Sequence, residues 1–167
     1  MLTRESGYRR TMTACFLGYI VQATICTLAP LLYARFQTEY QIPLGRISLM
    51  ITLTFAIQLL VDLASSFFVD RIGYRASTVL AHAMCATGLI FMTILPEILP
   101  SAFAGLLISV FCYAVGAGLL DITINPIVNS CPSTNSNQLL CLLHSFYCWG
   151  HMGVVLLSTA FFALFGI

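Results

Sequence analysis

Two polar residues interrupt a long apolar run in the second half of the chain. Asp121 and Asn125 are four residues apart, so they share one face if this run is a helix. An ionisable residue in a membrane helix costs about 2.5–3.5 kcal/mol, and it is by default a candidate functional residue. The pair predicts a solute-binding or proton-binding site; the alternative is a buried acid that only holds two helices together. Gly116 and Gly118 predict close helix packing, and Pro126 is expected to end or kink the helix.

A second group of polar residues follows in the next apolar run. His144, Tyr147 and His151 are spaced at i, i+3 and i+7, which places them on one face of a helix. If the two runs are antiparallel helices with a short loop, His144 lies at about the depth of Asp121, because each residue adds about 1.5 Å. An acid and a histidine at one depth suit proton coupling or a hydroxyl-rich solute. The alternative is a structural hydrogen-bonding stripe.

Two glutamines lie near the middle of two earlier apolar runs. An amide at Gln22 or Gln58 either binds a sugar-like solute or joins two helices by a hydrogen bond. We assign Gln22 to the candidate site and interpret Gln58 as a packing residue. Asp62 follows Gln58 by one helical turn. It is interpreted as a structural residue, with a second proton carrier as the alternative.

The composition shows that these polar residues stand in a lipid environment. Of the 167 residues, 59% are hydrophobic and only 8% are charged, and the mean hydropathy is +0.95. A soluble domain carries roughly 25% charged residues. A bilayer core is crossed by roughly 20 apolar residues in a helix. The sequence therefore predicts an all-α membrane protein with a single membrane domain over residues 1–167 and no soluble domain. About five transmembrane helices are expected, at residues 11–32, 47–69, 76–95, 102–127 and 138–165.

The arginines predict the orientation of these helices in the membrane, because cytoplasmic loops carry an excess of basic residues. With a cytoplasmic N-terminus, Arg35 and Arg46 lie outside, and residues 33–46 form the longest outer loop. The inner side then holds Arg4, Arg9, Arg10, Arg71 and Arg75. The last apolar run reaches Ile167 without a polar tail. We therefore expect an incomplete part of a longer protein, or a chain that assembles with a partner.

Several function classes lack their sequence features in this chain. The net charge of +1 provides no basic surface for nucleic acid. Lysine is absent, so the phosphate-binding pattern GxxxxGK[ST] does not occur. We expect no enzyme activity, no metal and no cofactor. A solute-binding or proton-binding site within membrane helices favours a transporter. Two alternatives remain: a small membrane protein that assembles with a partner, and a haem or metal redox protein that uses His82, His144 and His151.

A short charged segment separates the second and third apolar runs. Asp70, Arg71, Gly73 and Arg75 form the pattern Asp-Arg-x-Gly-x-Arg. This segment resembles the signature loop of the major facilitator superfamily, which joins helices two and three on the cytoplasmic side. The glycine is expected to allow a short turn. The resemblance implies that the charged residues form a conformational latch. Two positions depart from the family pattern, Ser66 and Tyr74.

A narrower resemblance covers the last two apolar runs. Residues 116–126, with the sequence GAGLLDITINP, resemble helix four of the fucose permease branch, the hexose–proton symporters. Residues 143–150, with the sequence LHSFYCWG, resemble helix five of that branch. The resemblance implies a twelve-helix secondary transporter that moves a small solute, such as a sugar, by alternating access between two halves.

The same resemblance assigns roles to residues of this chain. It implies that Asp121 takes part in proton coupling or sugar recognition. Cys26 stands where the family has an acid in helix one. The expected partners are the solute, a proton, the lipid bilayer and the missing C-terminal helices or a partner chain, and the expected location is a bacterial plasma membrane. The candidate residues for solute binding or proton coupling are Gln22, Asp121, Asn125, His144 and Tyr147.

Overall fold

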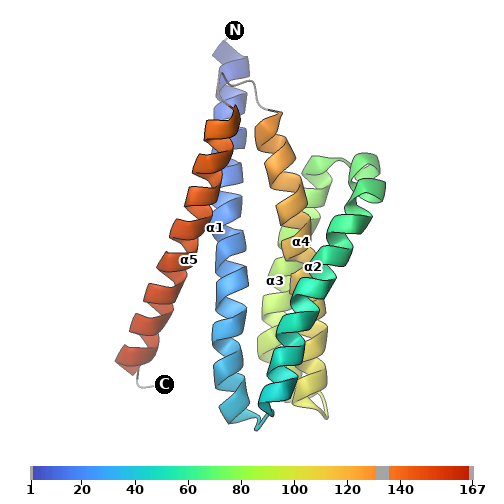
Figure 1. Ribbon diagram of the computed structural model, residues 1–167, viewed down its shortest axis with the longest axis vertical. Coiled ribbons are helices and arrows are strands. Elements are labelled where there is room, and N and C mark those ends of the chain that lie inside the picture. Colours follow the sequence, from blue (N-terminus) through green and yellow to red (C-terminus); the bar gives the residue numbers. More distant parts are fainter. Residues whose placement is uncertain (1, 131–135, 166–167) are drawn as a thin grey trace. The chain divides into compact units, whose positions relative to one another are not determined.

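The computed structural model describes residues 2–130 and 136–165, with the backbone alone for residues 2–7, 66 and 136. Five helices account for nearly all of the described residues (Figure 1). They are α1 (Leu2–Glu39), α2 (Leu44–Ile72), α3 (Tyr74–Ile98), α4 (Ala102–Asn129) and α5 (Ser136–Phe165). Each of the five contains an apolar stretch long enough to cross a membrane. The predicted all-α membrane fold with five transmembrane helices is therefore confirmed.

The first helix is longer than predicted at both ends. α1 continues to Glu39, and its connection to α2 consists of residues 40–43 only. Arg35 and Glu39 form a salt bridge of 3.7 Å at i, i+4, which supports the last turns. The helix ends where Gln41 adopts a left-handed conformation with φ of 53°. The predicted outer loop over residues 33–46 is wrong, because most of its polar residues lie on the exposed face of a helix.

A single residue separates α2 from α3. Gly73 has φ of 87°, a conformation that glycine adopts without steric cost. Its backbone nitrogen donates to the oxygen of Val69 in α2 at 2.8 Å, and its own oxygen accepts from the nitrogen of Ser77 in α3 at 3.1 Å. Gly73 therefore completes both helices at once, and the expected short turn is confirmed.

The helices form two compact units, which are described separately. The terminal unit consists of residues 1–28 and 123–167, and the central unit consists of residues 29–122. α1 and α4 are continuous helices that contribute to both units. Pro126 lies inside α4 and does not end it, since the helix continues to Asn129. The single membrane domain expected from the sequence stays a prediction.

Glycines bring α3 and α4 into close contact within the central unit. A Cβ on Gly88 would lie 2.5 Å from the backbone nitrogen of Tyr113, and one on Gly116 would lie 2.7 Å from the oxygen of Ala81. The two backbones therefore meet directly, as small residues permit between membrane helices. The close packing expected at Gly116 is confirmed. The buried face of α3 consists of Ser77, Ala81, Cys85, Gly88, Met92 and Pro96.

A chain of hydroxyl groups joins three helices of the central unit. Tyr33 on α1 is hydrogen bonded to Tyr113 on α4, and Tyr113 lies 2.8 Å from the hydroxyl of Thr54 on α2. Thr54 donates to the backbone oxygen of Met50 at 2.9 Å. Because each hydroxyl has one proton, Thr54 accepts from Tyr113, and Tyr113 accepts from Tyr33. This directed chain was not predicted from the sequence.

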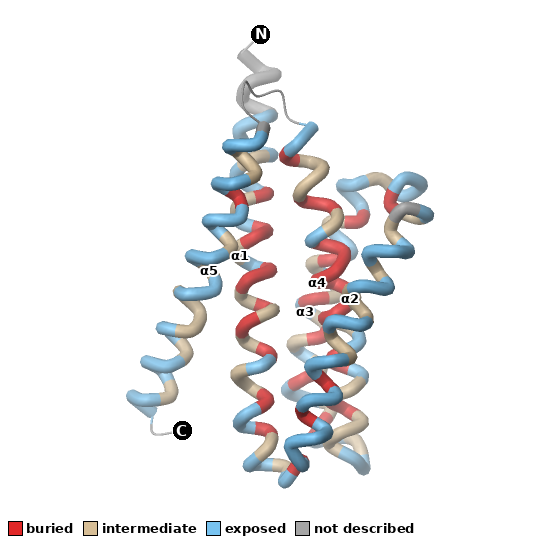
Figure 2. Tube along the Cα trace, in the orientation of Figure 1, coloured by how far each residue is buried: buried red, intermediate tan, exposed pale blue. Residues whose placement is uncertain are grey.

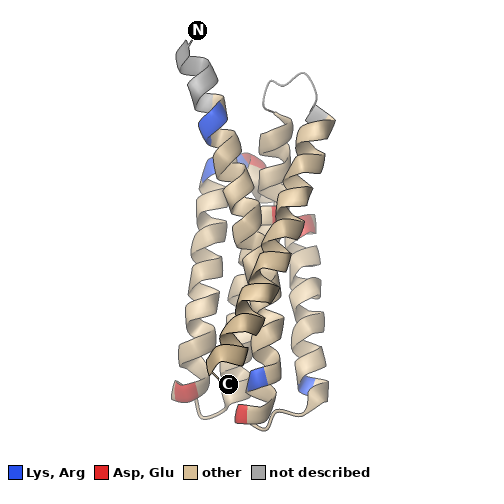
Figure 3. Ribbon diagram, turned by 90° about the vertical axis from the view of Figure 1, so that its left-hand side faces the viewer, with Lys and Arg blue, Asp and Glu red and all other residues tan. Residues whose placement is uncertain are grey.

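Burial differs strongly between the helices (Figure 2). In α4, 61% of the most apolar stretch is buried within the protein, whereas in α5 the corresponding value is 0%. Charged residues are sparse along all five helices (Figure 3). The exposed side chains of α5 are largely apolar, with Leu157 and Leu164 among the most exposed. This surface is suited to contact with lipid or with another membrane segment.

Candidate functional site

Tyr19 is the centre of a polar cluster in the terminal unit. This residue of α1 is only 3% exposed. Its hydroxyl donates a hydrogen bond of 2.7 Å to Oδ1 of Asn125 on α4. A tyrosine buried among membrane helices needs such a partner, because an unpaired hydroxyl would cost free energy. The predicted site residue Asn125 is therefore held by a residue that the sequence interpretation had omitted.

Two predicted residues of α5 surround the same tyrosine ring. The imidazole of His144 stacks on Tyr19 with 5.6 Å between ring centroids and an interplanar angle of 17°. Tyr147 meets the ring edge-on at 6.0 Å and 72°. The structure thus brings three helices together in a Tyr19 cluster, defined as Tyr19, Asn125, His144 and Tyr147. Three of its four members were predicted separately from the sequence.

Gln22 lies one helical turn after Tyr19 on α1. Its side chain is 1% exposed, and its Oε1 atom has no hydrogen-bond partner among the described residues. A buried acceptor left unsatisfied costs about 1–3 kcal/mol. Such a group in a folded protein calls for an explanation, and a hydroxyl donor from a bound molecule is one that fits a polar cluster.

Small residues allow α5 to pack closely on α1. A Cβ on Gly150 would lie 3.0 Å from Cβ of Ala23 and 3.2 Å from Cα of Ile20. On one side of this crossing, the rings of Phe16 and Phe146 are 4.8 Å apart. The crossing point therefore determines which face of α5 meets α1, and it places His144 and Tyr147 beside Tyr19.

Asp121 belongs to the central unit and has a different neighbour. Gly118 lies at the crossing of α4 with α2, where its Cβ would be 3.3 Å from Cα of Gln58. Close packing at Gly118 is thus confirmed. Val61 also lies at this crossing, and Asp62 is the next residue of α2. Asp62 is close enough to Asp121 for the two carboxylates to repel each other. Both side chains are exposed.

The structure does not bring Asp121 and His144 together in one unit. His144 belongs to the terminal unit, and Asp121 lies in the central unit, at residues 29–122. Their similar depth in the membrane therefore stays a prediction. Asp121 differs from the other four candidate residues in this respect. Asp121 also interacts with another acid, Asp62 of the same unit.

The predicted latch residues surround the turn at Gly73. Asp70, Arg71 and Arg75 are exposed. Among the described residues, no salt bridge within 4.0 Å joins these three charges, so the latch stays a prediction.

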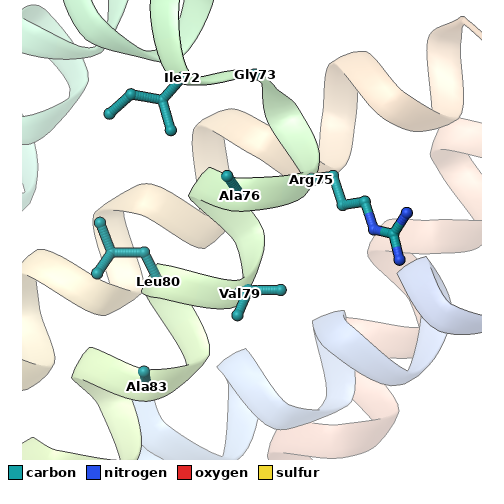
Figure 4. Close-up of a pocket in the computed structure, with 7 residues that line it drawn as sticks. All are labelled: Ile72, Gly73, Arg75, Ala76, Val79, Leu80 and Ala83. Carbon is teal, nitrogen blue, oxygen red and sulfur yellow. The ribbon is translucent and has the colours of Figure 1, made fainter.

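Beside the turn lies an open depression of about 600 Å³ on α3. Figure 4 shows the guanidinium of Arg75 pointing away from the aliphatic side chains of this depression. The lining residues are Ile72, Gly73, Arg75, Ala76, Val79, Leu80 and Ala83.

One signal in the sequence could have identified Tyr19. It stands three residues before Gln22 in an apolar run, so the two share a helix face, as His144 and Tyr147 do. Among the described residues, no three His, Cys, Asp or Glu side chains lie together in a group that could hold a metal ion.

Comparison with family models, curated proteins and solved structures gave no match to this chain.

Proposed function

We propose that this chain is part of a secondary transporter of the major facilitator type that carries a small polyhydroxylated solute, such as a sugar. The observation that carries the proposal is the Tyr19 cluster together with the unpaired Oε1 of Gln22. Solute sites combine aromatic surfaces with a few polar groups in fixed positions. Polar groups within membrane-spanning helices are costly, and they commonly mark a substrate or ion path.

Each member of the site would make a distinct contact with a sugar. Oε1 of Gln22 accepts a hydrogen bond from a hydroxyl group. The ring nitrogens of His144 and the hydroxyl of Tyr147 offer both donors and acceptors. Tyr19 keeps Asn125 in position through its 2.7 Å hydrogen bond. The helices already hold these groups in place, which lowers the entropic cost of binding the solute.

The exposed acids of α2 and α4 would serve proton coupling in the proposed transporter. Asp62 and Asp121 are exposed side chains of apolar helices, and such residues usually face a bundle interior or a water-filled cavity. In alternating access the transport path is closed first on one side of the membrane and then on the other. Such a path requires more helices than the five described. These would come from further chain or from a partner chain. In this proposal the N-terminus is cytoplasmic and the location is a bacterial plasma membrane, as the arginine distribution and the family resemblance suggest.

The test is uptake of labelled hexoses by cells that express the complete gene product. We expect Asp121→Asn to abolish proton-dependent uptake, and Gln22→Leu to lower uptake at least tenfold. Gln22→Leu removes an unsatisfied acceptor, so the free energy of unfolding should not fall. Gln37→Leu, a change of the same type in α1, is the matched control. Absence of hexose uptake by the wild type would refute the proposed solute. Unchanged uptake by Gln22→Leu together with lower stability would make Gln22 a packing residue.

A further inference from the structure

His151 on α5 forms a hydrogen bond whose direction follows from its partner. Nδ1 of His151 lies 2.7 Å from Oγ1 of Thr27 on α1, and the same Oγ1 lies 2.6 Å from the backbone oxygen of Ala23. A carbonyl oxygen only accepts, so it takes the one proton of the Thr27 hydroxyl. Thr27 must then accept at its oxygen. The donor is an N–H group at Nδ1 of His151.

This hydrogen bond determines which atom of the imidazole binds a proton. A neutral histidine with its proton on Nδ1 has a lone pair on Nε2. Protonation at Nε2 gives the imidazolium without breaking the bond to Thr27. Thr27 is 5% exposed and is held by Ala23, whereas the side chain of His151 is exposed. The ring can therefore gain and lose a proton at one atom while α1 holds it in place.

The ring of His151 adjoins the Tyr19 cluster. Its centroid is 6.3 Å from that of Tyr147, whose ring is in contact with Tyr19 at 6.0 Å. From residue 11 onward, the helices of the terminal unit contain no acidic residue and no arginine. These segments therefore offer His151 no acidic or arginine side chain as an ion-pair partner. The titratable side chains nearest to it along α1 and α5 are Cys26, His144, Tyr147 and Cys148.

We propose that His151 is a proton-binding residue that couples proton movement to solute binding at the Tyr19 cluster. This inference rests on the proposed transport function. A proton from water adds to Nε2 on one side of the membrane and returns to water on the other, and no covalent bond to the solute forms. Protonation converts Nε2 from an acceptor to a donor and places a positive charge beside Tyr147. The affinity for the solute therefore changes with pH.

The tautomer is measured by NMR on the protein labelled with ¹⁵N-histidine in lipid nanodiscs. The chain has three histidines, so His→Asn variants assign the signals. We expect neutral His151 to have its proton on Nδ1, and we expect the second proton to bind at Nε2. Thr27→Val should release this preference. Thr24→Val is the control, because the Thr24 hydroxyl donates only to the backbone oxygen of Ile20. This variant should leave the tautomer of His151 unchanged. A proton on Nε2 of neutral His151, or a Thr27→Val spectrum equal to wild type, would overturn the inference.

The coupling is measured as hexose affinity of the complete gene product at several pH values. In the wild type we expect the affinity for hexose to change about fivefold or more with pH. A factor of about five is the lower end of the usual coupling between two binding sites. In His151→Gln the change should disappear. If the hexose affinity of His151→Gln depends on pH as in the wild type, the proposed role of His151 is refuted and the proposed function stands. Wild-type protein that binds no hexose refutes the proposed solute. The NMR measurement of the His151 tautomer uses no solute, so its outcome is independent of that result.

Discussion

The contact of α3 with α4 makes a quantitative prediction for Gly116. A Cβ at this position would lie 2.5 Å from Sγ of Cys85 and 2.7 Å from the backbone oxygen of Ala81, whereas ordinary contacts begin at 3.4 Å. Because the second neighbour is backbone, the two helices must separate by several tenths of an ångström. Overpacking of this kind costs about 1–3 kcal/mol. The replacement of glycine by alanine in a helix returns at most about 1 kcal/mol.

Gly153→Ala is the matched control for Gly116→Ala. Both glycines lie in apolar helices, and a Cβ on Gly153 has no neighbour within 4 Å. The gain in helix propensity is therefore common to both variants, and the difference between them reports the steric term. We expect Gly116→Ala to be about 1–3 kcal/mol less stable than Gly153→Ala. Unfolding by SDS in mixed micelles, followed by circular dichroism, measures both free energies.

Two results would contradict this reasoning. No loss of unfolding free energy relative to the wild type in either variant would show that α3 and α4 do not meet at Gly116 as described. Equal losses in both variants would show that any added methyl group in an apolar helix is harmful, independent of its neighbours. A double variant with Cys85→Ala, which removes the contact at 2.5 Å but not the backbone contact, separates the two steric terms. We expect it to recover only part of the loss.

Two further predictions concern the turn and the hydroxyl chain. Gly73→Ala should destabilise the protein by about 1–3 kcal/mol, because φ of 87° with ψ of 148° is a conformation that residues with Cβ rarely adopt. A Cβ at Gly73 or at Gly45 has no neighbour within 4 Å, so Gly45→Ala should be nearly neutral in the same unfolding assay. Tyr113→Phe should cost about 1–3 kcal/mol, because the buried hydroxyl of Tyr33 loses its acceptor. The exposed Tyr74→Phe is the control, and an equal effect of both would exclude a role of the chain in stability.

The sequence predicted the helices well and their ends less well. Five apolar runs became five helices, because length and apolar composition determine whether a segment crosses a bilayer. The ends depend on residues outside the apolar core, such as Arg35 and Glu39, whose salt bridge supports turns beyond it. At Gly73 the sequence was sufficient, since a short charged segment with glycine between two helices leaves few conformations for the turn.

The candidate site was predicted as separate parts. Helical spacing placed Asn125 on the face of Asp121, and His144 on the face of Tyr147. Spacing along one helix says nothing about which face of another helix it meets. The bond from Tyr19 to Asn125 and the stacking on His144 therefore required the packed structure.

Residue types and their order determined that this chain forms membrane helices, and which polar residues those helices contain. Transfer of a helix into lipid depends on its own composition and length, so no tertiary information was needed. The tertiary structure decided the partners of those residues. The crossing of α5 with α1 at Gly150 sets the rotation of both helices, and this rotation places Tyr19 in the polar cluster and Thr27 against His151. These contacts join residues more than 100 positions apart, and their geometry follows from helix packing rather than from any local pattern.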